Sequence, residues 1–192
     1  IDMAGGYKLG KFVNVGYNPS FEPSTTDQYS ATGGATMVVG ESNTVKGINN
    51  FVVGKENFMH AAASECIIAG TGNQVSGSSF GISMFGYINN AQASAAGATV
   101  AGLGSVVGGS GPTAIGYTAT GTGDFSAAIG RGTASGYESV AIGASTASQT
   151  SAIGIGGSAT ASKAVAIGSG SQAQTTGAIA IGRGSMGAGR KG

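Results

Sequence analysis

Six residues near the end of the chain, Gly182-Arg183-Gly184-Ser185-Met186-Gly187, spell the glycine pattern of dinucleotide-binding sites. That pattern works by opening a helix whose N-terminus holds pyrophosphate, and an acidic residue about 20 positions further on contacts the ribose. Only five residues follow Gly187, and none of them is acidic. We therefore expect no nucleotide cofactor at this position.

The run Gly77-Ser78-Ser79-Phe80-Gly81 has the spacing of a nucleophile elbow. In that motif a serine lies on a turn from strand to helix, and a downstream histidine accepts its proton. The one histidine of this chain, His60, lies upstream. We expect no catalytic serine, and we interpret the chain as a protein without enzymatic activity.

The chain also contains few residues that could bind a metal ion. The single histidine and the single cysteine, Cys66, cannot build a zinc site within one chain. Calcium-binding β-rolls carry a recurrent aspartate, whereas Asp124 and Glu138 are isolated here. We expect neither a metal nor another cofactor. The alternative is an ion bound on the axis of a trimer by three copies of one polar residue.

The composition limits the partners and the fold. Nine basic and eight acidic residues give a formal net charge of +1, which provides no electrostatic reason to expect nucleic acid or anionic lipid. The 38 glycines do not recur at every third position, which excludes collagen. No apolar stretch reaches the ~20 residues of a membrane span. Cys66 is expected to be a small buried apolar residue. These features leave low-complexity filler or a thin repeat fold.

A sequence repeat favours the repeat fold over low-complexity filler. An apolar or small pair followed by an anchor glycine recurs at Gly40, Gly54, Gly70, Gly86, Gly102, Gly116, Gly130, Gly143, Gly154, Gly168 and Gly182. The spacings are 14, 16, 16, 16, 14, 14, 13, 11, 14 and 14 residues, too short for the ~33 residues of a two-helix repeat. The period predicts an all-β parallel β-roll, or solenoid, over residues 35–186. Each coil of ~14 residues would have two short strands and two turns, with a positive φ at the anchor glycine.

Alternation within each coil predicts which side chains share a face. The position before the anchor glycine (position −1) becomes Ile in all six later copies, and we expect it to face the interior. Position −2 is Val38, Val52, Ile68, Met84 and Val100, then Ala, and would face outward. An outward apolar column must be covered, and a coil this small needs help with its core. We therefore expect association with further copies of the chain.

Two further columns are candidate sites. Asparagine occupies position +3 in four successive coils, at Asn43, Asn57, Asn73 and Asn89. We expect a structural ladder of amide hydrogen bonds, with sugar or ion binding as the alternative. Position +1 has the mixed character of an exposed column and carries Tyr87, Leu103 and Tyr117 on successive coils. These three are the candidate binding residues, because exposed tyrosine is common at recognition surfaces; packing on neighbouring turns is the alternative.

The later repeats resemble a known family. Ser139-Val140-Ala141-Ile142-Gly143 and Ala164-Val165-Ala166-Ile167-Gly168, with their small-residue connectors, are similar to the YadA-like head repeats of trimeric autotransporter adhesins. The resemblance is strong over residues 112–186 and weaker over 35–111. It implies a left-handed β-roll, a homotrimer and a bacterial head domain that binds a host matrix protein, a glycan or a cell-surface receptor. Similar repeats occur in phage-type and injection-type fibres.

The flanking segments complete the predicted organisation. Residues 1–34 depart from the repeat and would cap the first coil, join a preceding domain or form a ligand-binding tip, because an uncovered coil exposes strand edges. Residues 187–192 are expected to be a glycine-rich neck or tail. The predicted role is attachment by a surface adhesin head outside the cell, with the outer-membrane anchor outside this piece. A phage-type fibre with a receptor-binding tip, or a passive spacer, is the alternative.

Overall fold

The computed structural model describes residues 12–15 and 36–188, and their regular structure is entirely β. A 12-stranded sheet contains β1 (Phe12–Val15), β2 (Thr36–Glu41), β4 (Phe51–Lys55), β6 (Ile67–Thr71), β8 (Ser83–Tyr87), β10 (Thr99–Leu103), β12 (Thr113–Tyr117), β14 (Ala127–Gly130), β16 (Val140–Gly143), β18 (Ile153–Ile155), β20 (Val165–Ile167) and β22 (Ile179–Ile181). An 11-stranded sheet contains β3 (Thr44–Val45), β5 (Phe58–Met59), β7 (Gln74–Val75), β9 (Asn90–Ala91), β11 (Val106–Val107), β13 (Thr120–Gly121), β15 (Thr133–Ala134), β17 (Thr146–Ala147), β19 (Ser158–Ala159), β21 (Gln172–Ala173) and β23 (Met186–Gly187).

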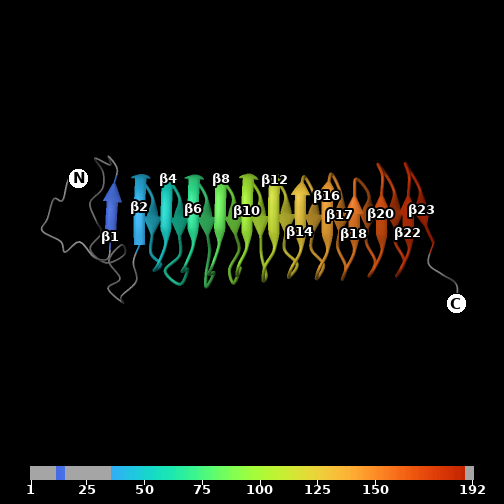
Figure 1. Ribbon diagram of the computed structural model, residues 1–192, viewed down its shortest axis with the longest axis horizontal. Coiled ribbons are helices and arrows are strands. Elements are labelled where there is room, and N and C mark those ends of the chain that lie inside the picture. Colours follow the sequence, from blue (N-terminus) through green and yellow to red (C-terminus); the bar gives the residue numbers. More distant parts are fainter. Residues whose placement is uncertain (1–11, 16–35, 189–192) are drawn as a thin grey trace, which may run out of the picture.

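The two sheets are the two sides of a parallel β-solenoid. Each coil contributes one strand to each sheet and then pairs in parallel with the next coil, as in the register of Gly102 with Gly116. Figure 1 shows the coils stacked into a straight rod, in the order of the sequence. The predicted all-β solenoid of about 11 coils is confirmed. Strand β1 extends the first sheet by pairing with β2, and the rest of the expected cap, together with residues 189–192, lies outside the described residues.

The facing predicted for the first sheet was wrong. Position −2 points into the solenoid: Val52, Ile68, Met84 and Val100 are fully buried, and so are the Ala residues that follow them from Ala114 onward. Position −1 points outward instead, and Ile115 and Ile129 are about two-fifths exposed.

The width of the coil determines which side chains fit inside it. The interior is also lined from the second sheet, by Val45, Met59 and Val75 in the early coils and by Ala134, Ala147, Ala159 and Ala173 in the later ones. The 16-residue coils enclose methionine and isoleucine, whereas the coils of about 13 residues have room for little more than alanine between their sheets. Since protein interiors are closely packed, the Ile column of the later coils has space only on the outer surface.

From Gly40 to Gly116 the anchor glycines stand where successive coils approach closely. Gly102 has φ +135°, a conformation that side chains with a Cβ rarely adopt, and a Cβ there would collide with the carbonyl oxygen of Gly116. The predicted positive φ is confirmed at this position. One anchor was misplaced, because Gly154 pairs with Ala141 and is therefore a position −2 residue. The anchor of that coil is Gly156, and Ile155 belongs to position −1 rather than to the +1 column.

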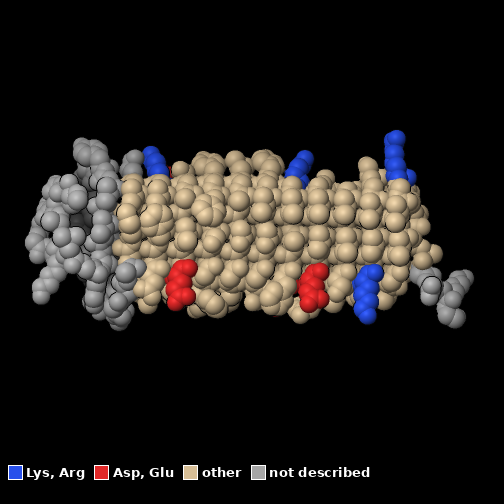
Figure 2. All heavy atoms as spheres, in the orientation of Figure 1, with Lys and Arg blue, Asp and Glu red and all other residues tan. Residues whose placement is uncertain are grey.

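Charged and uncharged side chains occupy different parts of the outer surface. In Figure 2 the charged side chains project from the two edges where the coils turn, and the broad face between them is almost free of charge. Among the described residues no helix has the length and the apolar character of a membrane span.

Candidate functional site

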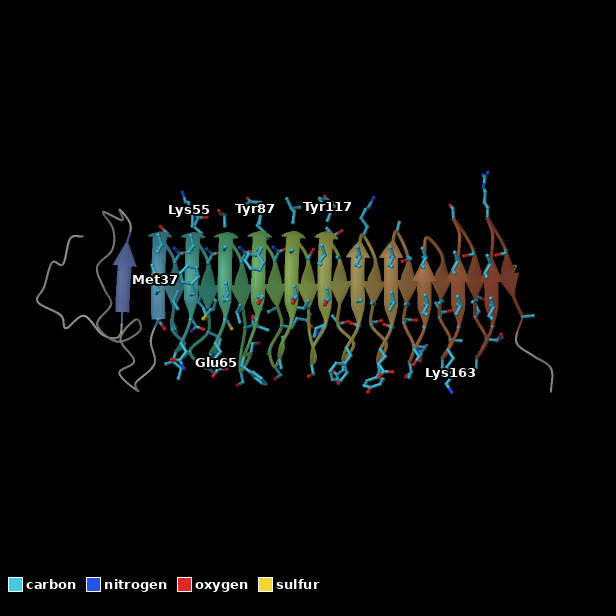
Figure 3. The ribbon with its side chains drawn as sticks, in the orientation of Figure 1. Met37, Lys55, Glu65, Tyr87, Tyr117 and Lys163 are labelled. Atoms are coloured by element: carbon cyan, nitrogen blue, oxygen red, sulfur yellow. The ribbon has the colours of Figure 1, made fainter. Side chains whose placement is uncertain are left out.

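The three candidate binding residues lie side by side on one edge of the solenoid. Leu103 is in register with Tyr87 on one side and with Tyr117 on the other, at the ends of β8, β10 and β12. Tyr87 is 48% exposed and Tyr117 57% exposed, and Leu103 is also exposed. Figure 3 shows Tyr87 and Tyr117 projecting from the same edge as Lys55, while Glu65 and Lys163 project from the opposite edge. The side chains therefore face solvent rather than packing into the turns.

The turn that follows these strands adds a residue that the sequence analysis missed. Ile88 is 54% exposed and has φ +53°, which is unusual for a β-branched residue. Gly72 and Gly104 occupy the corresponding position in the two neighbouring coils, also at positive φ, and the Ile88 side chain reaches over Gly72. An isoleucine between two glycines in one column was the sequence signal for this residue.

Arg131 extends the same edge by one coil. Its guanidinium carbon lies 6.0 Å from the ring centroid of Tyr117, at the outer limit for a cation–π contact. Tyr87, Ile88, Leu103, Tyr117 and Arg131 are called the edge ridge below. The ridge combines two phenol hydroxyls, two aliphatic side chains and one cation, so it can offer apolar contact and hydrogen bonds.

The four asparagines lie inside the solenoid, at the corner below the edge ridge, and they are buried. Each side-chain amide from Asn57 onward donates to the side-chain oxygen of the preceding asparagine, at 2.9–3.0 Å. Each amide also donates to an anchor-glycine carbonyl of the next coil, from Asn43 to Gly54 at 2.7 Å through Asn89 to Gly102 at 2.9 Å. Because the amides are enclosed and bonded on both sides, they form a coil-to-coil ladder and are not open to a ligand.

Ser105 follows Asn89 in this column, and the next coil has Ala119 there. The Ser105 backbone N–H donates to the Asn89 side-chain oxygen at 2.9 Å, and the Ser105 hydroxyl donates to the Gly116 carbonyl at 3.0 Å. Ser105 thus keeps a side-chain hydrogen bond to the next coil with a smaller side chain than asparagine.

The motif-like residues form no reactive constellation. Ser79 is buried, and its hydroxyl donates to the backbone oxygens of Ser76 and Gln92. The GxGxxG run lies on a turn and strand β23 rather than at a helix. His60 accepts a hydrogen bond from the Ala62 backbone at 3.2 Å through Nδ1. Within residues 12–15 and 36–188, no three His, Cys, Asp or Glu side chains gather as metal ligands would.

Cys66 is enclosed in the core, where its thiol donates to the Ser64 carbonyl at 3.1 Å. Burial raises the pKa of this thiol, because the charged thiolate loses its solvation. A buried cysteine of this kind packs as a small apolar residue and is a poor nucleophile.

Comparison with known proteins supplies no relative. No protein-family model matches the chain, and neither a curated protein nor a solved structure matches it significantly.

Proposed function

We propose that this chain is a rigid segment of a homotrimeric surface fibre that attaches its bearer to a target surface. The observation that carries the proposal is the outer face of the 12-stranded sheet. Positions −3 and −1 leave a row of exposed large apolar side chains along it, at Met37, Phe51, Ile67, Phe85, Ile115, Ile129, Ile155, Ile179 and Ile181. A continuous apolar surface that follows a whole rod is typical of an interface.

A second copy of the same chain is the natural cover for this face. Both surfaces would then have the same coil-to-coil spacing, so apolar rows of equal period could pack along their full length. The resemblance of residues 112–186 to YadA-like heads supports three chains and a left-handed roll. Association would also supplement the alanine-lined interior of the later coils, which buries little apolar area by itself.

Attachment would use the edge ridge of each chain. Three copies of the ridge on one rod would turn weak contacts into strong avidity without a deep pocket. The proposed partner is a host matrix protein, a glycan or a cell-surface receptor, and the proposed location is outside the cell, with an anchor in another part of the protein. A binding role rather than catalysis fits a ridge that carries no nucleophile or general base.

The oligomeric state is tested first. Light scattering coupled to size-exclusion chromatography should give three times the mass of one chain. The double variant I115D/I129D puts two charges at adjacent positions of the apolar face and should give a monomer. The control T120D/T133D puts two charges at adjacent positions of the other sheet and should remain a trimer. A wild-type monomer at micromolar concentration would overturn the proposed assembly.

Attachment is tested separately. The variant Y87S/L103S/Y117S should bind cells or immobilised matrix at least about tenfold more weakly, a loss of about 1.4 kcal/mol, and remain trimeric. The control F58S/F80S removes exposed aromatic area elsewhere and should bind normally. Unchanged binding by the triple variant would reject the ridge as the contact surface. Binding confined to residues 1–34 would favour the phage-type tip, and no binding at all would favour a spacer.

A further inference from the structure

A second exposed cluster lies at the edge opposite the edge ridge. The backbone N–H of Glu138 donates to the Asp124 carbonyl at 2.9 Å, which stacks the pair Tyr137-Glu138 on the pair Asp124-Phe125 of the preceding coil. The rings of Phe125 and Tyr137 meet edge to face, with centroids 6.0 Å apart and planes at 90°. These four residues are called the aromatic–carboxylate patch below.

Both rings are presented to solvent. Phe125 is 58% exposed and Tyr137 47% exposed. Phe125 has φ +56°, and the stacked position is Gly111 in the coil before it. The Phe125 ring lies over Gly111, where an added Cβ would come within 2.9 Å of the ring. Glycine would fit this turn at lower backbone cost, so the backbone conformation of the turn does not require the exposed ring.

The patch is negatively charged. The pKa of Tyr137 is raised, mainly by the negative charge of Glu138 and by a hydrogen bond to it, with a smaller contribution from Asp124. The Asp124 carboxylate accepts a hydrogen bond from the Ser110 backbone at 2.8 Å, which fixes its position. Among the described residues neither carboxylate forms an ion pair. Arg131 lies at the other edge, beside Tyr117, and Lys163 lies two coils further along the same edge as the patch.

These features select a cation rather than a sugar. A sugar ring stacks on a flat aromatic surface, whereas two rings at 90° form a corner. An aromatic face attracts a cation within about 6 Å of its centroid, and carboxylates bind guanidinium through paired hydrogen bonds. Arg131 on Tyr117 shows the same pairing within the chain. We propose that the aromatic–carboxylate patch binds an arginine side chain in an exposed basic segment of a partner protein.

The proposal does not rest on the fibre role above, because the patch lies within two coils of one chain. The full chain is titrated with a blocked Gly-Gly-Arg-Gly-Gly peptide, and two-dimensional NMR follows the amides of residues 124, 125, 137 and 138. These signals should shift and saturate. The citrulline peptide has nearly the same shape without the charge and should bind at least about tenfold more weakly. Equal binding of both peptides, or no shift with either, would overturn the proposal.

Variants then locate the site. F125G/Y137S should abolish the arginine-dependent shifts while the unfolding midpoint stays close to that of the wild type, since glycine suits the positive φ of Phe125. D124N/E138Q should weaken binding at least about tenfold. The control E56Q/E65Q removes the same formal charge elsewhere and should bind as the wild type does. An equal loss of binding in the control would show that the net charge of the protein, rather than the patch, causes the effect.

A third titration uses choline chloride. Saturable shifts with choline but not with the arginine peptide would assign the patch to a lipid headgroup and overturn the proposal. A wild-type monomer in light scattering would reject the trimer without affecting these titrations, so the two proposals fail separately.

Discussion

The side-chain amide of Asn73 donates a hydrogen bond to the side-chain oxygen of Asn57 at 3.0 Å, although the two residues are 16 positions apart. The same amide donates to the Gly86 carbonyl of the following coil at 2.9 Å. Three consecutive coils are thereby joined through one side chain. Because these groups are buried, any loss leaves polar atoms without water as a substitute.

Replacing Asn73 with alanine should therefore lower the free energy of unfolding by about 3 kcal/mol, since the Asn89 backbone N–H and the Gly86 carbonyl each lose their hydrogen bond to the Asn73 side chain. Urea denaturation followed by circular dichroism measures the change. Asn90 is the control, because its side-chain oxygen receives no hydrogen bond from any described residue. N90A should cost less than about 1 kcal/mol. Equal costs for both variants would show that the ladder adds nothing specific.

Replacing Gly102 with alanine should destabilise the solenoid by at least about 3 kcal/mol, because the new methyl group must displace the Gly116 carbonyl from the adjacent coil. Gly97 provides the comparison. It also has a positive φ, +59°, but an added Cβ meets nothing within 4 Å. G97A should cost only the backbone term of about 1 kcal/mol. The difference between the two melting temperatures isolates the close approach from the backbone preference.

The facing of positions −2 and −1 is tested by placing leucine at each. A141L adds volume between two sheets where Ala141 is fully buried, and should cost about 3 kcal/mol. I142L changes the shape of a partly exposed side chain and should cost less than about 1 kcal/mol. Chemical denaturation of the two variants gives the order. The reverse order would place Ile142 inside the coil.

The buried Cys66 thiol should make the free energy of unfolding depend on pH. Its pKa is raised by burial, so the folded chain keeps the proton to a higher pH than the unfolded chain, whose cysteine ionises near pH 8.5. Below that pH the protonated Cys66 thiol makes its full contribution to the free energy of unfolding. This contribution is lost as the pH rises from about 8.5 toward the folded pKa, with a slope of up to about 1.4 kcal/mol per pH unit. The stability difference between wild type and C66A should fall over this range, and a constant difference would contradict the burial of the thiol.

Much of the fold could be predicted because the repeat is a local property of the chain. From Gly40 to Gly116 each coil needs its anchor glycine at the same place, because a side chain there would combine an unfavourable φ with a collision against the carbonyl of the next coil. The asparagine column could be read in the same way, because identical amides at one position of a stacked coil come within bonding distance of one another.

The candidate site was predicted in part. A fixed distance from the anchor glycine was sufficient to place Tyr87, Leu103 and Tyr117 together, because β8, β10 and β12 are of equal length and pair without a shift. The pairing of Phe125 with Tyr137 was not predicted. These two residues face one another diagonally across coils of different length, a relation that no single offset describes.

The sequence by itself determined that the chain stacks as parallel coils, because backbone hydrogen bonding rewards any segment that repeats the same turns. Tertiary structure decided which side of each strand is the interior. Alternation tells which residues share a face but not where that face points, and the narrow space between the sheets admits Ala141 while excluding Ile142. Tertiary structure also decided the register between coils. Thr120, Thr133 and Thr146 follow their anchor glycines by four, three and three residues, yet they pair in one column of the second sheet. A turn can absorb one residue more or less, and only the hydrogen bonds between coils fix the alignment.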